Sequence, residues 1–392
     1  MIYMDNNATT ALHAKALEAM LPFLTEHYGN ASSKFYKTGR DAEQALYAAR
    51  QSVANQIGAK PNEVYFTGSG CEADNWAIKG IISAFDGRKK HIITSEIEHH
   101  AILNSCAYME KHGCEVTYLP VDEYGRVNPV DVEKSLRDDT AIVSIMLANN
   151  EIGTIEPIAD IAEIVHSHGA LMHTDAVQAM GHMAVDVREL GVDLMSMSAH
   201  KFHGPKGVGA LYIKNGVRID NFIHGGGQER GKRAATENVA GIVGMAKALE
   251  TANEKLAENC AHMRRLRDKL IDGVLERIPY TRLNGTRKER LCNNANFSFK
   301  YIEGESILMM LDMKGVAASS GSACASGSLD PSHVLLAIGL PHEIAHGSLR
   351  LSLSADTTDA EVDEVLEILP PIVERLREMS PLYEEVKRKE NK

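Results

Sequence analysis

The sequence predicts an α/β fold in which a mostly parallel sheet is covered by helices on both faces. Between residues 60 and 215, short runs rich in β-branched residues alternate with amphipathic stretches of helical period. Such alternation is typical of parallel strands joined by right-handed crossovers. The chain of 392 residues is long enough for two to three domains. We therefore expect a large α/β domain and at least one further unit.

Seven strands are expected in the large domain. They are Val64–Thr67, His91–Ser95, 115–120, 141–148, 170–174, 193–198 and Gly209–Ile213. Helices are expected between several of them, including 98–112 and 158–168, and Gly169 suits the left-handed position that ends the second of these helices. Ligands of parallel sheets bind beyond the carboxyl ends of the strands, so residues that follow these strands are the candidates for chemistry.

Beyond residue 240 the pattern changes to that of a smaller α+β unit. A long helix-forming stretch at 239–278 links this unit to the sheet. Strands are expected at 296–300 and Ser348–Ser352, and an amphipathic helix at 359–379. The charge-rich tail 384–392 is expected to fray.

Charge and composition exclude several classes of protein. Lys and Arg number 42 against 53 Asp and Glu, a net charge of −11 without a long basic run, which argues against binding to a nucleic-acid backbone. No apolar run approaches the ~18 residues of a membrane span, and no secretory signal is recognisable. The six cysteines are too sparse for a disulfide scaffold and form no C-x-x-C pair. We expect a cytoplasmic protein with neither membrane nor nucleic acid as a partner.

A lysine follows one of the expected buried strands, in the motif S-A-H-K that ends at Lys201. Burial at such a position lowers the pKa of a lysine toward the neutral amine that Schiff-base chemistry needs. The alternative is a solvated lysine at the end of a strand.

A carboxylate follows an earlier strand, in the motif H-T-D-A-V-Q at 173–178. A pyridoxal phosphate (PLP) site needs a carboxylate against the pyridinium nitrogen, which Asp175 could supply, with Gln178 near the ring hydroxyl. Alternatively, Asp175 caps the helix that follows.

Two further strand ends could complete such a site. The turn T-G-S-G-C-E at 67–72, with Gly70 and Cys71, feeds a helix whose first amides could hold a phosphate monoester. After another strand come His99 and His100, either of which could act as a general acid or base, and His99 could stack on a flat cofactor. A surface histidine is the alternative, and no H-E-x-x-H or thiolate pair supports a metal site.

The smaller unit contributes two candidates. Cys324 lies in the small-residue segment S-S-G-S-A-C-A-S-G-S at 319–328, which predicts a mobile loop that presents a reactive thiol. Arg350 is charged in the middle of an expected strand, a position that suits a guanidinium binding a substrate carboxylate. The glycine-rich turn H-G-G-G-Q-E-R at 224–230, ahead of Thr236, is either an anion-binding loop or a solvated basic turn.

Together these motifs, with D-N-N-A-T-T at 5–10, resemble the cysteine desulfurases of the NifS/IscS type, which are PLP-dependent members of the class V aminotransferases. The resemblance covers almost the whole chain, in order. It implies the type I fold of PLP-dependent transferases, with a large PLP-binding domain at 15–257. The small domain would comprise 1–14 and 258–392 and carry the mobile cysteine loop at about 317–330.

The resemblance also implies a role for each candidate. Lys201 would form the Schiff base with the cofactor, Asp175 would pair with the pyridinium, and Gln178 and Asn150 would approach the ring hydroxyl. His99 would stack on the ring and move protons. The phosphate would be held by Gly70, Cys71, Ser198, His200 and, from the neighbouring subunit, Thr236.

The implied reaction takes sulfur from L-cysteine, leaving L-alanine. Arg350 and Asn150 would bind this substrate, and Cys324 would receive the sulfur as a persulfide. The acceptor would be a protein such as an iron–sulfur assembly scaffold, and Cys324 as a transient iron–sulfur ligand is the one metal-binding role expected. The shared phosphate site implies a homodimer.

Two alternatives remain open. One is another class V reaction, such as selenocysteine lysis or transamination. The other is a non-catalytic sulfur or iron–sulfur scaffold.

Four positions depart from the family pattern: Cys71 replaces a usual threonine, Ala235 a glycine, Ala31 a proline and Tyr36 a histidine. Because a thiol is a weak hydrogen-bond donor, weaker retention of the cofactor is expected.

Overall fold

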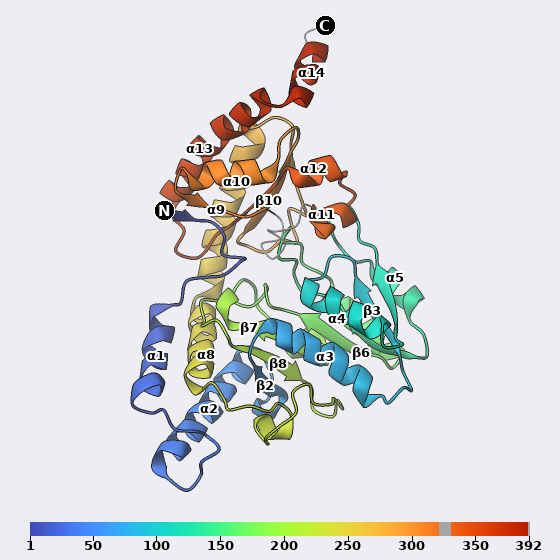
Figure 1. Cartoon of the computed structure of the whole chain (residues 1–392), viewed down its shortest axis with the longest axis vertical. Helices are drawn as coiled ribbons and strands as arrows, with labels where there is room; N and C mark the ends of the chain where they lie inside the picture. Colours follow the sequence, from blue (N-terminus) through green and yellow to red (C-terminus); the bar gives the residue numbers. More distant parts are fainter. Residues whose placement is uncertain (321–330, 391–392) are drawn as a thin grey trace.

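The computed structural model of the protein describes residues 1–320 and 331–390. Figure 1 shows a larger part built around a seven-stranded sheet and a smaller part above it that contains the C-terminal helices. Cys324 lies outside the described residues. No helix in the described ranges is both long and apolar enough to cross a bilayer.

The seven-stranded sheet confirms the predicted fold class. Its order is β2-β8-β7-β6-β5-β3-β4, in which β4, β3, β5, β6 and β7 pair in parallel and β8 is antiparallel to both of its neighbours. The strands are β2 Val64–Thr67, β3 His91–Ser95, β4 Glu115–Leu119, β5 Thr140–Ser144, β6 Leu171–Asp175, β7 Leu194–Ser198 and β8 Gly209–Ile213.

One strand is shorter than expected. The sequence predicts a strand at 141–148, but β5 ends at Ser144 and residues 145–148 form a buried connection. These four residues are all apolar, so their hydrophobicity reflects burial and does not distinguish a strand from a buried loop.

Helices cover both faces of the sheet (Figure 1). Neighbouring residues of one strand enter different hydrophobic clusters, as with Ile92 and Ile93, because successive side chains of a strand point to opposite faces. Gly169, at φ +69°, follows α6 as predicted. The helices of this part are α1 Ala14–Thr25, α2 Lys37–Gln56, α3 Gly70–Ala84, α4 His100–Glu110, α5 Pro129–Ser135, α6 Ile158–Ser167, α7 Val187–Leu190 and α8 Val239–Glu254, with short 3₁₀ turns at Pro61–Glu63, Ala199–Lys201 and Glu229–Gly231.

The predicted long helix at 239–278 is two helices. α8 ends at Glu254 and α9 Leu256–Arg277 begins after Lys255, whose φ of −125° and ψ of 25° leave the helical region. Helix-forming residues flank the break on both sides, so composition alone carries no signal for it. The break lies where the chain passes from the larger part to the smaller (Figure 1).

The smaller part packs helices on a three-stranded antiparallel sheet, β12-β10-β9. Its strands are β9 Thr281–Leu283, β10 Asn294–Phe299 and β12 Ser348–Ser352, and its further helices are α10 Gly304–Asp312, α11 His333–Ala337, α12 His342–His346, α13 Asp359–Glu378 and α14 Pro381–Glu390. The N-terminal strand β1 Ile2–Tyr3 pairs in parallel with β11 Val316–Ala317. The first residues of the chain are therefore held by residues more than 300 positions later.

The charge-rich tail is helical as far as Glu390, and its fraying stays a prediction. α14 begins at Pro381 and is anchored by Tyr383, whose ring centroid lies 5.7 Å from that of Tyr301. The guanidinium of Arg377 lies 5.7 Å from the centre of the Tyr383 ring. The charge-rich composition hides this aromatic anchor, because cation–π and ring contacts depend on a partner far away in the sequence.

Candidate functional site

A cavity of about 240 Å³ lies where the parallel strands end. The residues that follow β2, β3, β5, β6 and β7 meet there, and Arg350 reaches it from β12 of the smaller part. The predicted residues that line it are Gly70, Cys71, His99, Asn150, Asp175, Gln178, Ser198, His200, Lys201 and Arg350. Because the parallel strands end at the same edge of the sheet, residues from positions 70 to 350 of the chain lie together there.

Lys201 sits at the end of the short 3₁₀ turn that follows β7. Its Nζ donates to the main-chain oxygens of Asn7, at 2.6 Å, and Ala8, at 2.8 Å. Both oxygens belong to the N-terminal segment, which therefore directs the lysine before any ligand is present. The motif in this segment is visible in the sequence, but residue type alone gave no role for Asn7.

Asp175 ends β6 and is buried beside a second carboxylate, Asp74 of α3. Its Oδ1 accepts a hydrogen bond from the amide of Val177 at 2.8 Å. Burial raises the pKa of Asp175 to about 6, and burial together with the charge of Asp175 raises the pKa of Asp74. A cation bound against Asp175 would offset the cost of keeping this carboxylate charged.

Asp74 is a residue that sequence reasoning missed. Its Oδ1 lies 3.9 Å from Nε2 of His173 and has no hydrogen-bond partner in the part of the chain that the structure describes. Nε2 of His173 also lies 3.0 Å from Oγ of Ser196, while its Nδ1 lies 2.8 Å from Oγ of Ser144. The signal was weak, because an acid in the second turn of a helix is ordinary in sequence.

Gln178 holds one unused acceptor at the cavity. Its Nε2 donates to the main-chain oxygen of Asn7 at 2.9 Å. Its Oε1 is buried and has no hydrogen-bond partner among the described residues. Because leaving a buried acceptor unpaired is costly, this atom is matched to a ligand that donates a hydrogen bond.

The other end of the cavity is suited to an anion. Gly70 and Cys71 form the first turn of α3, where amide groups have no partner within the helix. A Cβ at Gly70 would lie 2.8 Å from Cγ2 of Val177 and 3.1 Å from Cβ of Ser198, so the close approach of the chain here requires glycine. The anion site would consist of these amides and the hydroxyl of Ser198. The dipole of α3 would attract the anion in place of a formally charged side chain.

The two cavity histidines are neutral at pH 7. Burial, together with the charge of Lys201, lowers the pKa of His99 to about 4 and that of His200 also to about 4. Nδ1 of His99 accepts from the amide of Ala101 at 3.1 Å, capping α4. The proton of the neutral His99 ring is therefore on Nε2.

Arg350 is fixed in place although it is almost completely buried, with 1% of its surface exposed. Nη1 donates to the main-chain oxygen of Asn150 and Nη2 to Oδ1 of Asp5, each at 3.0 Å. The predicted guanidinium is thus presented to the cavity by residues from both parts of the molecule.

One predicted residue is not brought to this cavity, and one lies outside the described residues. Thr236 is exposed and does not line it, and Cys324 lies outside the described residues. In the described ranges, no group of three or more His, Cys, Asp or Glu side chains is placed to hold a metal ion. Besides Asp74 and Asn7, the cavity includes Ser69 and Met146, which sequence reasoning also missed.

Comparison with known proteins gives one family and consistent relatives. Residues 2–365 match the family model described as aminotransferase class-V. A protein of Methanosarcina thermophila named cysteine desulfurase IscS is 56% identical over 381 residues, which cover 97% of this chain and 94% of the relative. A protein of Clostridium botulinum with the same name is 57% identical over 394 residues, which cover 100% of this chain and 99% of the relative.

Solved structures give the same picture. The structure of a protein named NifS-like protein superposes with a TM-score of 0.90 at 41% identity and covers 96% of this chain and all of its own. The structure of SspA in complex with cysteine superposes with a TM-score of 0.79 at 33% identity, over 91% of this chain and all of its own.

Proposed function

The chain belongs to the class-V aminotransferase family, and from that premise we propose that it is a cysteine desulfurase that uses PLP to move sulfur from L-cysteine to Cys324. The observation that carries the proposal is that Lys201, Asp175 and the first turn of α3 face one cavity. An amine, a buried carboxylate and an anion cradle are the three groups that PLP requires. Relatives more than half identical over nearly the whole chain are named cysteine desulfurases, which supports the choice of reaction.

The residues present fit the cofactor. The pKa of Asp175 is raised by burial, and a bound cation would favour its charged form. Oε1 of Gln178 has no hydrogen-bond partner among the residues that the structure describes, and a ligand could donate to it. PLP offers both a protonated ring nitrogen and polar ring substituents. Asp175 would hold the ring nitrogen, Gln178 and Asn150 the ring hydroxyl side, and His99 one face of the ring. The phosphate would be held by Gly70, Cys71, Ser198, His200 and, from the partner subunit of a homodimer, the residue at position 236.

When bound, PLP supplies an electron sink that weakens the bonds at the α-carbon of an amino acid. Lys201 would attach the cofactor and would act as the base at the α-carbon of the substrate. The main-chain oxygens of Asn7 and Ala8, which accept from its Nζ, orient this amine in the cavity. His99 carries its proton on Nε2 and can donate it into the cavity.

Arg350 would bind the carboxylate of L-cysteine. A guanidinium held by Asp5 and by the main-chain oxygen of Asn150 keeps its orientation, so little side-chain freedom is lost when substrate binds. The similarity to SspA, whose solved structure is a complex with cysteine, supports a substrate of this size and charge.

Cys324 would accept the sulfur. Its thiolate attacks the sulfur of the substrate, an S–S bond forms as the Cβ–S bond breaks, and the electron pair of that bond stays with the carbon skeleton. Protonation of that skeleton and release give L-alanine, and Cys324 keeps the sulfur as a persulfide. The persulfide would then pass to an acceptor protein such as an iron–sulfur scaffold, consistent with the IscS name of the relatives.

The proposal includes a homodimer in a reducing, cytoplasmic setting, with 15–257 as the PLP-binding domain and 1–14 with 258–392 as the small domain. Thr236 is exposed and does not line the cavity of its own subunit, which supports its use by a partner subunit. The five cysteines of the described part are all free thiols, which supports a reducing compartment.

One experiment tests the reaction. The protein purified with PLP is incubated with L-cysteine, and L-alanine is measured together with the visible absorbance of the bound cofactor. We expect L-alanine from the wild type and neither L-alanine nor a borohydride-sensitive visible band from Lys201→Ala. Wild-type protein that binds PLP through Lys201 and yields no L-alanine would contradict the proposal.

A further inference from the structure

Two buried thiols meet at one main-chain oxygen. Sγ of Cys260 lies 3.1 Å from the carbonyl oxygen of His182, and Sγ of Cys292 lies 3.2 Å from the same oxygen. Two sulfurs that lie within hydrogen-bond distance of one oxygen are near enough for movement of their side chains to join them.

The thiol pair connects the two parts of the molecule. Cys260 lies in the second turn of α9 and Cys292 in the segment that leads into β10, and both pack with Met263 in a small cluster of their own. The oxygen that they share belongs to the larger part, in the turn that follows Gln178. The pair therefore fastens the smaller part to a segment that begins at the candidate site.

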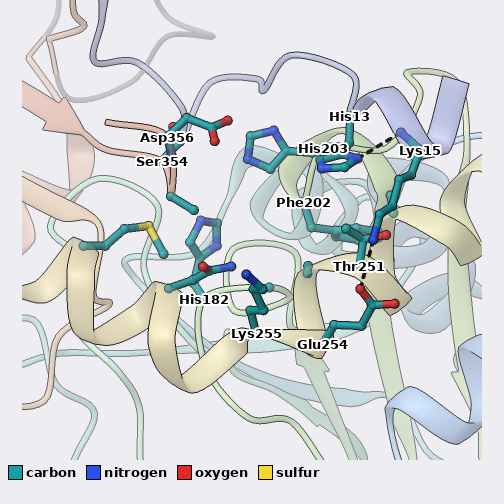
Figure 2. A pocket seen from close by; sticks show the side chains of 16 residues that line it. His13, Lys15, His182, Phe202, His203, Thr251, Glu254, Lys255, Ser354 and Asp356 are labelled. Atoms are coloured by element: carbon teal, nitrogen blue, oxygen red, sulfur yellow. Dashed lines mark hydrogen bonds and ion pairs between the residues drawn. The ribbon is translucent and has the colours of Figure 1, made fainter. Parts of the chain in front are cut away.

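A second cavity lies next to this pair, although neither cysteine is among the residues that line it. This cavity, drawn in Figure 2, has a volume of about 380 Å³ and shares no lining residue with the candidate site. His182 and Met263, the immediate neighbours of the thiols, line it, as does Asn259 next to Cys260. Figure 2 shows that Asp356 and Lys255 border the same space, so the walls are polar enough to admit a small polar solute.

We propose that Cys260 and Cys292 are a dithiol site that a peroxide-class oxidant converts to a disulfide. In the first step the sulfur of Cys260 attacks one oxygen of hydrogen peroxide, the O–O bond breaks, a sulfenic acid forms and one water leaves. In the second step the sulfur of Cys292 attacks the sulfenic sulfur, the S–O bond breaks, the S–S bond forms and a second water leaves. Two thiols are oxidised by two electrons in total, and one peroxide is reduced to two waters.

The local chemistry distinguishes this pair from the other cysteines. The neighbouring thiol of Cys292 lowers the pKa of Cys260, whereas burial raises the pKa of Cys106 to about 12 and also raises that of Cys114. A thiol with a lower pKa is more often the reactive thiolate. Cys260 and Cys292 pack in the same small cluster, so a thiol oxidised at either position has its partner beside it.

The disulfide would act on the candidate site by two short routes. The disulfide removes both S–H donors from the carbonyl oxygen of His182. The side chain of His182 also contacts the candidate site, because its Nδ1 lies 3.1 Å from the main-chain oxygen of Gln178. The disulfide also moves Cys292, whose neighbour Asn293 donates from Nδ2 to Oδ1 of Asn7 at 3.0 Å. Gln178 and Asn7 both belong to the hydrogen-bond network around Lys201.

The test uses the PLP-loaded full chain. The protein is treated with hydrogen peroxide until the exposed Met313 is oxidised, free thiols are alkylated, and the protein is digested without reductant for mass spectrometry. We expect the peptide of Cys260 linked to the peptide of Cys292, with the link reversed by dithiothreitol and Cys106 and Cys114 recovered as alkylated thiols. Recovery of Cys260 and Cys292 as alkylated thiols, or as separate higher oxides, would overturn the proposal.

Variants and hydrogen exchange separate the link from a general loosening of the fold. Cys260→Ser and Cys292→Ser should each abolish the linked peptide, and Cys114→Ser should leave it intact. In the wild type, oxidation should speed amide exchange at residues 178–183 roughly tenfold, the effect of losing about one net hydrogen bond, and reduction should reverse it. Exchange that is equal in the oxidised and reduced proteins would overturn the coupling to the site. The result does not depend on whether the chain is a desulfurase.

Discussion

The main-chain oxygen of Asn7 accepts hydrogen bonds from Nζ of Lys201 at 2.6 Å and from Nε2 of Gln178 at 2.9 Å. The side chain of Asn7 is itself fixed, because its Nδ2 donates to the main-chain oxygen of Asn150 and its Oδ1 accepts from Asn293, each at 3.0 Å. The N-terminal segment therefore sets the position of the lysine, although it is far from the lysine in sequence.

This relationship predicts that the side chain of Asn7 controls how the cofactor attaches. Asn7→Ala removes both side-chain hydrogen bonds and frees the main-chain oxygen to move. We expect the rate of PLP attachment to Lys201 to fall roughly tenfold, since about one net hydrogen bond of positioning is lost. The measurement is borohydride reduction after timed addition of PLP, followed by quantification of pyridoxyl-modified Lys201.

Asn55→Ala on α2 is the control, because Asn55 is exposed and does not line the cavity. An Asn7→Ala protein that attaches PLP as fast as the Asn55→Ala protein would show that Lys201 needs no guidance from the N-terminal segment.

The raised pKa of Asp175 predicts that this carboxylate destabilises the cofactor-free protein at pH 7 and stabilises the complex with the cofactor. Its folded-state pKa of about 6 lies above the usual 3.8, so the folded cofactor-free protein binds more protons than the unfolded chain between these values. Stability from this group is then lost as the pH rises from about 4 to about 6, and the full cost is present at pH 7. Asp175→Asn removes that cost and should stabilise the cofactor-free protein at pH 7 by roughly 1–3 kcal/mol.

Urea unfolding of the cofactor-free proteins at pH 4 and pH 7 measures this effect. The variant should gain at pH 7, gain little at pH 4, and bind PLP far more weakly, because an amide cannot stabilise a pyridinium cation. A variant that is less stable than the wild type at pH 7 would indicate that the carboxylate is already compensated without the cofactor.

Cys71 predicts loose retention of the phosphate. The thiol stands at the first turn of α3 in the cavity and donates hydrogen bonds weakly, so Cys71→Thr should add a donor to the cradle. We expect wild-type protein to lose its visible cofactor band several-fold faster than Cys71→Thr during dialysis. Cys114→Ser serves as the matched control. An undiminished band in the wild type, unchanged by the threonine, would refute the assignment.

Arg350 predicts a selective effect on substrate binding. Lysine at this position keeps the positive charge but loses the planar pair of donors that a carboxylate can accept together. Arg350→Lys should raise the KM for L-cysteine by at least about tenfold, in line with the loss of a charge-assisted hydrogen bond. Steady-state kinetics of L-alanine formation measure it, and thermal unfolding checks the buried ion pair with Asp5. An unchanged KM in a stable variant would mean that another group binds the carboxylate.

The sequence was most informative where chemistry follows strands. Asp175 and Lys201 could be placed at one edge of a sheet because parallel strands end together. Asp74 and Asn7 could not be found in this way: one lies within a helix, and the other contributes mainly its backbone, which leaves no trace in residue type. The break at Lys255 was also hidden, because the domains and not the local propensities determine where the helix ends.

The role of Cys324 is the central claim, and its persulfide tests it most directly. PLP-loaded protein is given L-cysteine under anaerobic conditions, blocked with an alkylating reagent and analysed by mass spectrometry of the peptide that contains Cys324. We predict one added sulfur atom on Cys324, formed together with L-alanine, and no L-alanine turnover by Cys324→Ser. Full turnover by Cys324→Ser, or L-alanine formed by the wild type while Cys324 carries no extra sulfur, would contradict the account.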